Sequence, residues 1–259
     1  MTNRADEMKA SLISVCAQQI MQNGLKIFAI SGAQGSGKTT LAANLQETLR
    51  QSGMHCGVVS LDDYYFSRRD RQILARKIHP LFAMRGVAGT HQIERLQQDL
   101  ELQRQGKALT LPRFDKASDD QSAALPAAFY DILIVEGWCL GAMVQSAEQL
   151  AQPVNMLDSM PDAATWRGYQ NQQLALWYQP LWPLMQQMVY LQAPDWSTIY
   201  HWRQQQEEAL WRQQGKGMDT VMLQQFMLPF QRWTEAMLGG QICPGVQRVQ
   251  LNESRQVLY

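Results

Sequence analysis

The chain has 259 residues, 46% of them hydrophobic, so it can bury the core of one large α/β domain or of two small ones. Lysine plus arginine and aspartate plus glutamate both number 23, and this balance excludes the global positive charge that favours nucleic acid or an anionic membrane. The four cysteines lie far apart, which indicates neither a zinc site nor a disulfide framework and is typical of a reducing cytoplasm.

The first 24 residues combine charges with an apolar stretch, as a signal peptide does. Gln18, Gln19 and Gln22 interrupt this stretch and no small-residue cleavage site follows, so the pattern favours an amphipathic lead-in helix over residues 1–24. No apolar run approaches the length of a membrane span. We therefore expect a soluble cytoplasmic protein without a nucleic-acid or membrane partner.

Residues 32–40 read GAQGSGKTT and match the phosphate-binding loop pattern G-x-x-x-x-G-K-[ST]. The pattern predicts that backbone N–H groups cradle phosphates, that Lys38 reaches the outer phosphates and that the Thr39 hydroxyl binds Mg²⁺. An apolar strand over 25–31 and a helix from Lys38 to Gly53 are expected on its two sides, which favours this loop over a plain glycine-rich turn. The candidate phosphate-binding residues are Gly32, Ala33, Gln34, Gly35, Ser36, Gly37, Lys38, Thr39 and Thr40.

Beyond the loop, strands alternate with helices. Strands are predicted over 56–61, 130–138, 188–194 and 246–251, with an extended segment over 108–114 whose pairing Pro112 limits. Helices are predicted over 92–106, 164–179, 196–214 and 219–238, a turn-rich break over 85–91, and a charged helix or loop after residue 61. Such alternation indicates an α/β fold with parallel strands, and we interpret residues 1–259 as a single domain.

Carboxylates follow two of the predicted strands at the sheet edge where ligands of open α/β sheets collect. Asp62 and Asp63 end the second strand, and alternation along the chain predicts that one of them faces the phosphates, where it could take a proton from an acceptor hydroxyl. Glu136 ends the apolar strand ILIVE and is a candidate Mg²⁺ ligand. The alternatives are an acidic pair in a solvated loop and a surface glutamate beside a turn.

The second half of the chain is rich in tryptophan and contains two candidate arginines. Arg203 and Arg212 lie nine residues apart on one predicted helix, which puts them on roughly opposite sides of it, so both serve one site only if the helix bends. Ordinary helix-surface charges are the alternative interpretation. Most of the tryptophans are expected to pack in the core or under a lid.

The order of the motifs GAQGSGKTT, SLDDYYF, RGVAGTH, PRFDK, EGWCLG and WRQQQEEALWRQQGKGM resembles the D-glycerate 3-kinase-like branch of the P-loop kinases, which are kin to uridine kinase, pantothenate kinase and phosphoribulokinase. The resemblance runs from about Leu25 to Gly239. It implies a P-loop NTPase fold, a three-layer α/β/α arrangement with a mainly parallel Rossmann-like sheet and a helical lid at about 196–218. It also implies ATP as phosphoryl donor with Mg²⁺, and a small-molecule acceptor that carries a hydroxyl group.

The resemblance also assigns roles to residues. Asp62 matches a catalytic base, Lys38 the phosphate lysine, Thr39 and Glu136 the metal-binding pair, and Arg203 and Arg212 match arginines on the lid helix, which closes over the phosphates. Acceptor-side candidates are Asp62, Tyr65, Arg85, His91, Arg113, Asp115 and Lys116. For an acceptor with a carboxylate, a fork-shaped arginine is the apt partner, and Arg113 is the first choice.

Two departures from the family pattern bear on the acceptor. In the segment RGVAGTHQ, Ala88 stands where the family usually has proline and Gln92 where it has aspartate, and the tail CPGVQRVQLNES lacks the aspartate expected before the last strand. Both departures weaken the inference that glycerate is the substrate. Pantothenate or a nucleoside is the alternative acceptor, and an ATP-binding regulatory protein without catalysis is the alternative class. A GTPase-type switch is disfavoured, because the chain has no N-K-x-D segment and Glu136 replaces the D-x-x-G of a switch strand.

Overall fold

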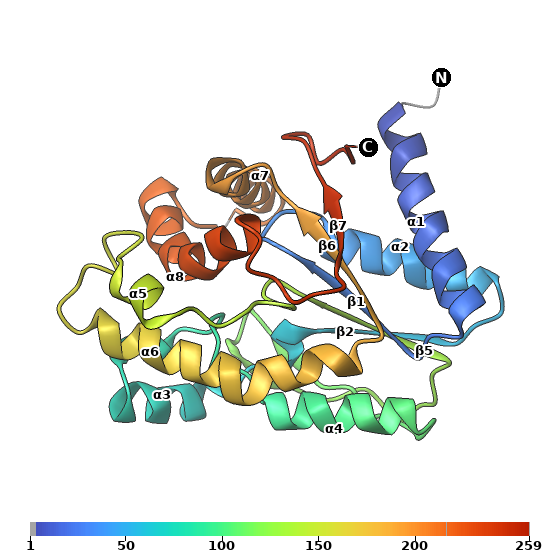
Figure 1. Cartoon of the computed structure of the whole chain (residues 1–259), viewed down its shortest axis with the longest axis horizontal. Coiled ribbons are helices and arrows are strands. Elements are labelled where there is room, and N and C mark those ends of the chain that lie inside the picture. Colours follow the sequence, from blue (N-terminus) through green and yellow to red (C-terminus); the bar gives the residue numbers. More distant parts are fainter. Residues whose placement is uncertain (1–3, 216, 259) are drawn as a thin grey trace.

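The centre of the structure is a five-stranded parallel sheet in the order β2-β5-β1-β6-β7 (Figure 1). The computed structural model describes residues 4–215 and 217–258. Its strands are β1 (Ile27–Gly32), β2 (Cys56–Ser60), β5 (Ile132–Gly137), β6 (Gln187–Gln192) and β7 (Gln247–Gln250). The predicted α/β class and mainly parallel sheet are confirmed.

Helices cover both faces of this sheet (Figure 1). On one face lie α1 (Arg4–Asn23), α2 (Lys38–Gln51) and α7 (Trp196–Gln214). On the other face lie α4 (Ile93–Arg104) and α6 (Ala163–Gln173), the latter extended by a π-helical turn over Leu174–Tyr178. The helix α8 (Thr220–Leu238) contributes to both cores, with Leu223 and Met227 in one and Phe230 and Trp233 in the other.

Every residue of β1 and of β5 is buried, so these two strands form the centre of the core. In β1, Ile27 and Ala29 pack into the core beneath α4, whereas Phe28 and Ile30 pack beneath α2. This alternation is the period of two that a strand imposes on its side chains. A strand buried on both faces reads as a continuous apolar run, which is why the sequence identified β1 and β5 so directly.

Shorter elements connect these layers: η1 (Leu61–Tyr64), α3 (Arg68–Lys77), η2 (Pro80–Ala83), the antiparallel hairpin of β3 (Arg113–Asp115) and β4 (Asp120–Ser122), α5 (Ala147–Ala151) and η4 (Gln179–Leu184). The extended segment predicted over 108–114 therefore joins a separate hairpin and not the main sheet. The helix predicted over 164–179 ends its regular part at Gln173 and widens into the π-helical turn. Pro180, which has no N–H for a helical hydrogen bond, follows that turn.

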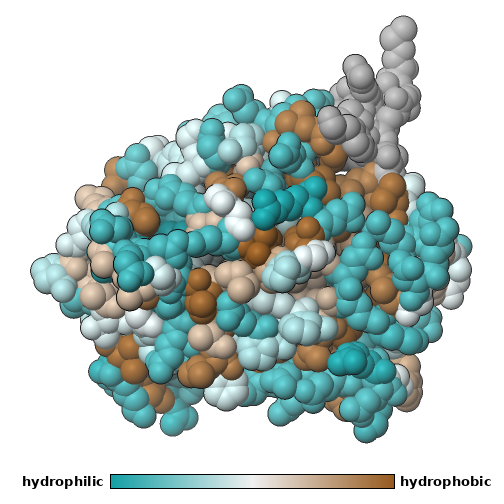
Figure 2. Space-filling model, in the orientation of Figure 1, coloured by the Kyte–Doolittle hydropathy of each residue, from teal (hydrophilic) through white to brown (hydrophobic). Residues whose placement is uncertain are grey.

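The lead-in helix predicted over 1–24 is α1, and residues 1–3 of that prediction lie outside the described residues. Cys16, Ala17 and Ile20 of α1 are buried in the core beneath α2, and the helix ends before Gly24. Within residues 4–215 and 217–258, none of the helices combines the length and apolar character that a membrane span requires. On the face shown in Figure 2, hydrophobic residues are interspersed with hydrophilic ones.

The tryptophans divide between core and surface. Those at 166, 182, 202 and 233 are buried, which agrees with the packing role expected of them. Trp177 and Trp211 are partly exposed. Two buried tryptophans bear on the candidate site: Trp202 packs beside the phosphate-binding loop, and Trp138 lines the larger pocket.

Candidate active site

The phosphate-binding loop lies between the end of β1 and the start of α2, as its sequence pattern predicts. Gly35 and Gly37 adopt φ angles of 78° and 92°, in the left-handed region that glycine tolerates best. A Cβ atom on Gly35 would also come within 2.7 Å of the Trp202 Cβ atom. The loop conformation therefore depends on glycine for both its backbone angles and its packing.

Lys38 and Thr39 open α2 at the base of this loop. The Lys38 Nζ donates to the Ala33 carbonyl oxygen at 3.0 Å, so the ammonium group folds back over the loop. Burial lowers the pKa of Lys38, and the nearby carboxylates of Glu136 and Asp62 oppose that effect. The lysine charge is thus held beside the backbone amides that the pattern assigns to phosphates.

Thr39, in the first turn of α2, contacts Glu136 at the end of β5. The Thr39 hydroxyl donates to Glu136 Oε1 at 3.0 Å, and Glu136 is buried at the end of β5, next to β1. Two oxygen ligands at this separation fit Mg²⁺, which commonly takes one or two protein ligands and completes its shell with water and substrate phosphates. In the part of the chain that the structure describes, no group of three or more His, Cys, Asp or Glu residues is arranged to hold a metal ion. A site that borrows phosphate oxygens needs no such group.

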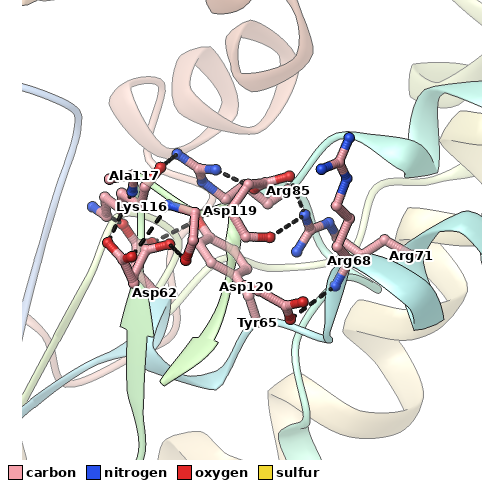
Figure 3. Close-up of polar contacts among 12 residues, drawn as sticks. Asp62, Tyr65, Arg68, Arg71, Arg85, Lys116, Ala117, Asp119 and Asp120 are labelled. Atoms are coloured by element: carbon pink, nitrogen blue, oxygen red, sulfur yellow. Dashed lines mark hydrogen bonds and ion pairs between the residues drawn. The ribbon is translucent and has the colours of Figure 1, made fainter. Parts of the chain in front are cut away.

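Asp62 faces this pair from the neighbouring strand end. It lies in the 3-10 turn η1 directly after β2, where Ser60 caps the turn through the Asp62 N–H at 3.2 Å. Its carboxylate accepts from the Tyr65 hydroxyl at 2.7 Å and from Lys116 Nζ at 2.7 Å (Figure 3). Burial acts to raise the pKa of Asp62, but Lys116, the Tyr65 hydroxyl and His91 together lower it below the ordinary value. Asp62 is therefore a fixed, ionised carboxylate.

Asp63 points elsewhere. Its carboxylate accepts from the Ser60 N–H at 3.0 Å and from Arg113 Nη1 at 2.9 Å, so it connects η1 to β3. The expectation that one of the two aspartates faces the loop agrees with this arrangement. Both aspartates belong to the turn η1 and not to β2, so the turn, not strand alternation, makes their side chains point in different directions.

One pocket of about 690 Å³ joins these groups. Its lining includes Lys38, Thr39, Asp62 and Glu136, from three adjacent strand ends. Gln34 and Gly35 of the loop, together with Tyr65, Arg85, Lys116 and Arg203, also line it. A second cavity, of about 360 Å³, lies on the other side of the loop and is lined by Gly35, Ser36, Gly37 and Thr40, by apolar residues of α1 and of the chain after β7, and by Arg255.

Arginines and an aspartate form the outer wall of the larger pocket (Figure 3). Arg85 contacts Asp119 at close range, and the guanidinium of the fully buried Arg71 donates to the same carboxylate at 2.5 Å. Phe114 lies beneath both guanidinium groups, at 5.5 and 5.6 Å from its ring centroid. One carboxylate thus serves two arginines, and Arg85 lines the pocket while Arg71 supports it from behind.

His91 lies behind Tyr65 in this wall. Its ring stacks on Tyr65 with centroids 4.6 Å apart, and its Nδ1 lies 2.6 Å from the Tyr178 hydroxyl. That hydroxyl accepts from the Gly89 N–H at 3.0 Å, so it can donate its own proton to Nδ1. Burial lowers the pKa of His91 to about 4, and the charge of Asp62 only partly opposes this. His91 is therefore neutral at physiological pH.

The two candidate lid arginines separate, as their spacing on α7 implies. Arg203 lines the pocket, forms an ion pair with the buried Glu207 and lies over the Phe226 ring at 5.5 Å. Arg212 is 80% exposed and pairs loosely with Glu208 at 3.8 Å. The helix does not bend enough to bring both to one site.

The structure brings together most of the residues predicted for the site, but not all. Among the acceptor-side and lid candidates, His91, Arg113, Asp115 and Arg212 lie outside the pocket lining formed by the described residues, and His91 reaches it only through Tyr65. Arg113 binds Asp63 and backbone carbonyls, and Asp115 accepts from two N–H groups of its own turn. Asp119 and Glu207 were missed. Asp119 carries no local sequence signal, because its partner Arg85 is distant in the chain. Glu207 could have been found from its i,i+4 spacing to Arg203 on the predicted helix.

The sheet and the loop define the class: this is a protein of the P-loop NTPase fold. The uncharacterized kinase mug58 of Schizosaccharomyces pombe is 30% identical over 222 residues, which cover 78% of this chain and 76% of that protein. The chloroplastic D-glycerate 3-kinase of Arabidopsis thaliana is 26% identical over 216 residues, 78% of this chain and 45% of the plant protein. No family model matches the sequence.

A solved structure supports the same assignment at the level of the fold. D-glycerate 3-kinase from Cryptococcus neoformans var. grubii superposes with a TM-score of 0.81 at 23% identity, over 96% of this chain and 98% of the fungal one. The chain therefore belongs to the D-glycerate 3-kinase-like family of P-loop kinases, and by class it is a kinase.

Proposed function

We propose that this kinase transfers the γ-phosphoryl group of ATP, with Mg²⁺, to a hydroxyl group of a small metabolite that carries a carboxylate, D-glycerate being the first candidate. The observation that carries the proposal is the single pocket lined by Lys38, Thr39, Asp62 and Glu136. Phosphoryl transfer needs held phosphates, a metal ion, an oriented acceptor and positive charge. The lining offers a side chain for each need.

The phosphate side of the pocket is proposed to hold the triphosphate and the metal ion. Backbone N–H groups of residues 32–38 and the Lys38 ammonium would bind the phosphates, and Thr39 and Glu136 would hold Mg²⁺. Bound there, the ion would neutralise charge that develops on the transferred group. Arg203 is the proposed lid cation on the same side, within a lid at about 196–218.

The acceptor side is proposed to hold the hydroxyl group and the carboxylate. Asp62 is held by Tyr65 and Lys116 with its carboxylate in the pocket, as a group that orients an acceptor hydroxyl and takes its proton requires. Arg85 replaces Arg113 as the proposed partner of the acceptor carboxylate, because Arg85 lines the pocket and Arg113 does not, although each is paired with an aspartate.

The smaller cavity on the other side of the loop is proposed to take the nucleoside half of ATP. It is next to Gly37 and Thr40, and Leu41, Leu251 and Val257 give it apolar walls. A volume of about 360 Å³ is within the range of small-molecule sites.

The departures at 88 and 92 leave this pocket intact. Ala88 is buried in the core and Gln92 lies at the start of α4, and neither is among the described residues that line the pocket. The alternative of an ATP-binding protein without catalysis thus loses its main support. Pantothenate also carries a carboxylate and stays a competing acceptor, whereas a nucleoside lacks the anionic group that Arg85 would bind.

The test is an acceptor panel with Mg-ATP, in which release of ADP is followed by a coupled assay. D-glycerate, pantothenate and uridine are compared, and turnover of D-glycerate above the other two is expected. Turnover restricted to uridine would refute the carboxylate acceptor, and absence of turnover across hydroxy acids, vitamins and nucleosides would refute the kinase role of this site.

A paired variant tests the base. Asp62→Asn should lower kcat by about 10² to 10⁴ while the KM for ATP changes little. The matched control is Asp131→Asn, at the opposite end of the sheet, where Asp131 accepts from the His55 N–H at 2.7 Å. Equal kcat for wild type and Asp62→Asn would show that the base is another group.

A further inference from the structure

The chain after β7 folds back as a tight hairpin over residues 251–257, here called the C-terminal hairpin. Leu251 and Val257 pair as an antiparallel bridge, and the Asn252 side chain accepts from the N–H groups of Ser254 and Gln256 at 3.0 and 2.9 Å. Arg255 occupies the turn with φ 61°, a left-handed conformation that is costly for a residue other than glycine. Such a conformation persists only where surrounding contacts hold it.

Those contacts are made to the phosphate-binding loop and to α7. Arg255 Nε donates to the Gly35 carbonyl at 2.6 Å, across 220 residues of sequence. Its guanidinium lies over the Trp202 ring at 5.1 Å, and the Trp202 indole N–H donates to the Glu253 carbonyl at 2.6 Å. Since Trp202 is also the side chain that packs against Gly35, three segments meet at one point.

The chemistry of a phosphate-binding loop explains why this point matters. When successive N–H groups turn toward an anion, the carbonyl groups of the loop turn outward and need donors of their own. Arg255 supplies a charged donor to one of them, and a charge-assisted bond is stronger than a neutral one. In the described part of the chain, no carboxylate lies within ion-pair distance of Arg255, so its charge is not neutralised beside the loop.

Because Arg203 is next to Trp202 in the chain, the contacts of Trp202 also bear on the larger pocket. Arg203 follows Trp202 on α7 and lines this pocket. Fixing Trp202 between Gly35 and the C-terminal hairpin therefore also fixes the rotation of α7 that aims Arg203.

We propose that Arg255 is a positioning residue that holds the phosphate-binding loop in its anion-binding shape and ties that loop to α7. Its side chain also lines the smaller cavity that we propose for the nucleoside. We nevertheless assign its effect to the polyphosphate of the nucleotide, through the bond to the Gly35 carbonyl. This inference rests on the proposed nucleotide site, but it does not depend on which acceptor is phosphorylated.

The test is calorimetric titration of the full chain with Mg-ADP, which needs no acceptor. Arg255→Met keeps the length of the side chain and the left-handed strain but removes the bond to Gly35. We expect its Kd for ADP to rise about tenfold or more. The Kd for adenosine, measured by competition with ADP, should change less than about twofold. Arg255→Lys, which retains a charged donor, should recover part of the loss.

The matched control is Arg248→Met on β7, whose arginine donates to the Gly240 carbonyl at 3.3 Å, and which should bind ADP as wild type does. Thermal unfolding of each variant separates loss of the fold from loss of binding, and if Arg255→Met does not fold, the lysine variant decides. Unchanged ADP affinity in both Arg255 variants would refute the inference alone. An equal loss for ADP and adenosine would refute it too, since Arg255 would then contact the nucleoside. Wild-type protein that binds no ADP would refute the proposed function itself.

Discussion

His91 gives the most quantitative prediction, because its burial couples the stability of the fold to pH. The side chain is 3% exposed, and burial lowers its pKa from 6.5 to about 4. Between these two values the unfolded chain takes up a proton at His91 that the folded chain does not, so the free energy of unfolding falls as the pH falls from about 7 toward 4. The full pKa difference corresponds to about 3 kcal/mol, of which about 2 kcal/mol is reached at pH 5.

Urea unfolding of wild type and His91→Gln at pH 7.5 and pH 5.0 checks this. Other groups titrate in the same range, so the informative quantity is the difference between the two proteins in their loss of stability. Wild type should lose about 2 kcal/mol more than His91→Gln over this interval. A shared offset at both pH values, caused by the altered contact with Tyr178, cancels in this comparison. Equal losses would refute the interpretation of His91 as a buried neutral imidazole.

Three further changes probe separate parts of the structure. Thr39→Ala removes the hydroxyl that contacts Glu136, so the Mg²⁺ concentration for half-maximal activity should rise, and an unchanged magnesium titration would contradict the metal assignment. Arg85→Met should raise the KM for a carboxylate acceptor about tenfold to a hundredfold, whereas the exposed Arg104→Met should not, as steady-state kinetics would measure. Arg232→Met leaves the carboxylate of Asp158, only 2% exposed, without its ion pair, and urea unfolding should show a loss of about 3 to 5 kcal/mol; a loss below 1 kcal/mol would contradict this.

The sequence predicted the parts of the site that depend on local chemistry. Lys38 and Thr39 follow from one continuous motif, and Glu136 from the end of an apolar run whose burial its composition indicates. The parallel order of the strands then brings the ends of β1, β2 and β5 together, so Asp62 had to lie near the loop. Each of these inferences needed only neighbours in the chain and the rules of sheet geometry.

The choice between arginines could not be made in that way. Arg85 and Arg113 both lie in irregular segments or short strands, and each has a carboxylate partner from a different part of the chain, Asp119 or Asp63. Which of them reaches the pocket depends on how the hairpin of β3 and β4 folds over η1, a long-range packing that no local pattern encodes. The sequence placed Arg212 in the lid by resemblance, although its spacing from Arg203 already indicated opposite sides of α7.

The ionised state of Asp62 is consistent with the chemistry proposed for it. In a loose transition state for phosphoryl transfer, the bond between the acceptor oxygen and phosphorus has formed only slightly. The hydroxyl proton therefore becomes acidic only late in the transfer. A carboxylate whose pKa lies below the ordinary value is then sufficient, because its main task is to orient the hydroxyl group, not to remove the proton at the start. Lys116 and Tyr65 hold that carboxylate in place, and their hydrogen bonds lower its pKa. The contacts that weaken Asp62 as a base are therefore the same contacts that give it a fixed direction toward the acceptor.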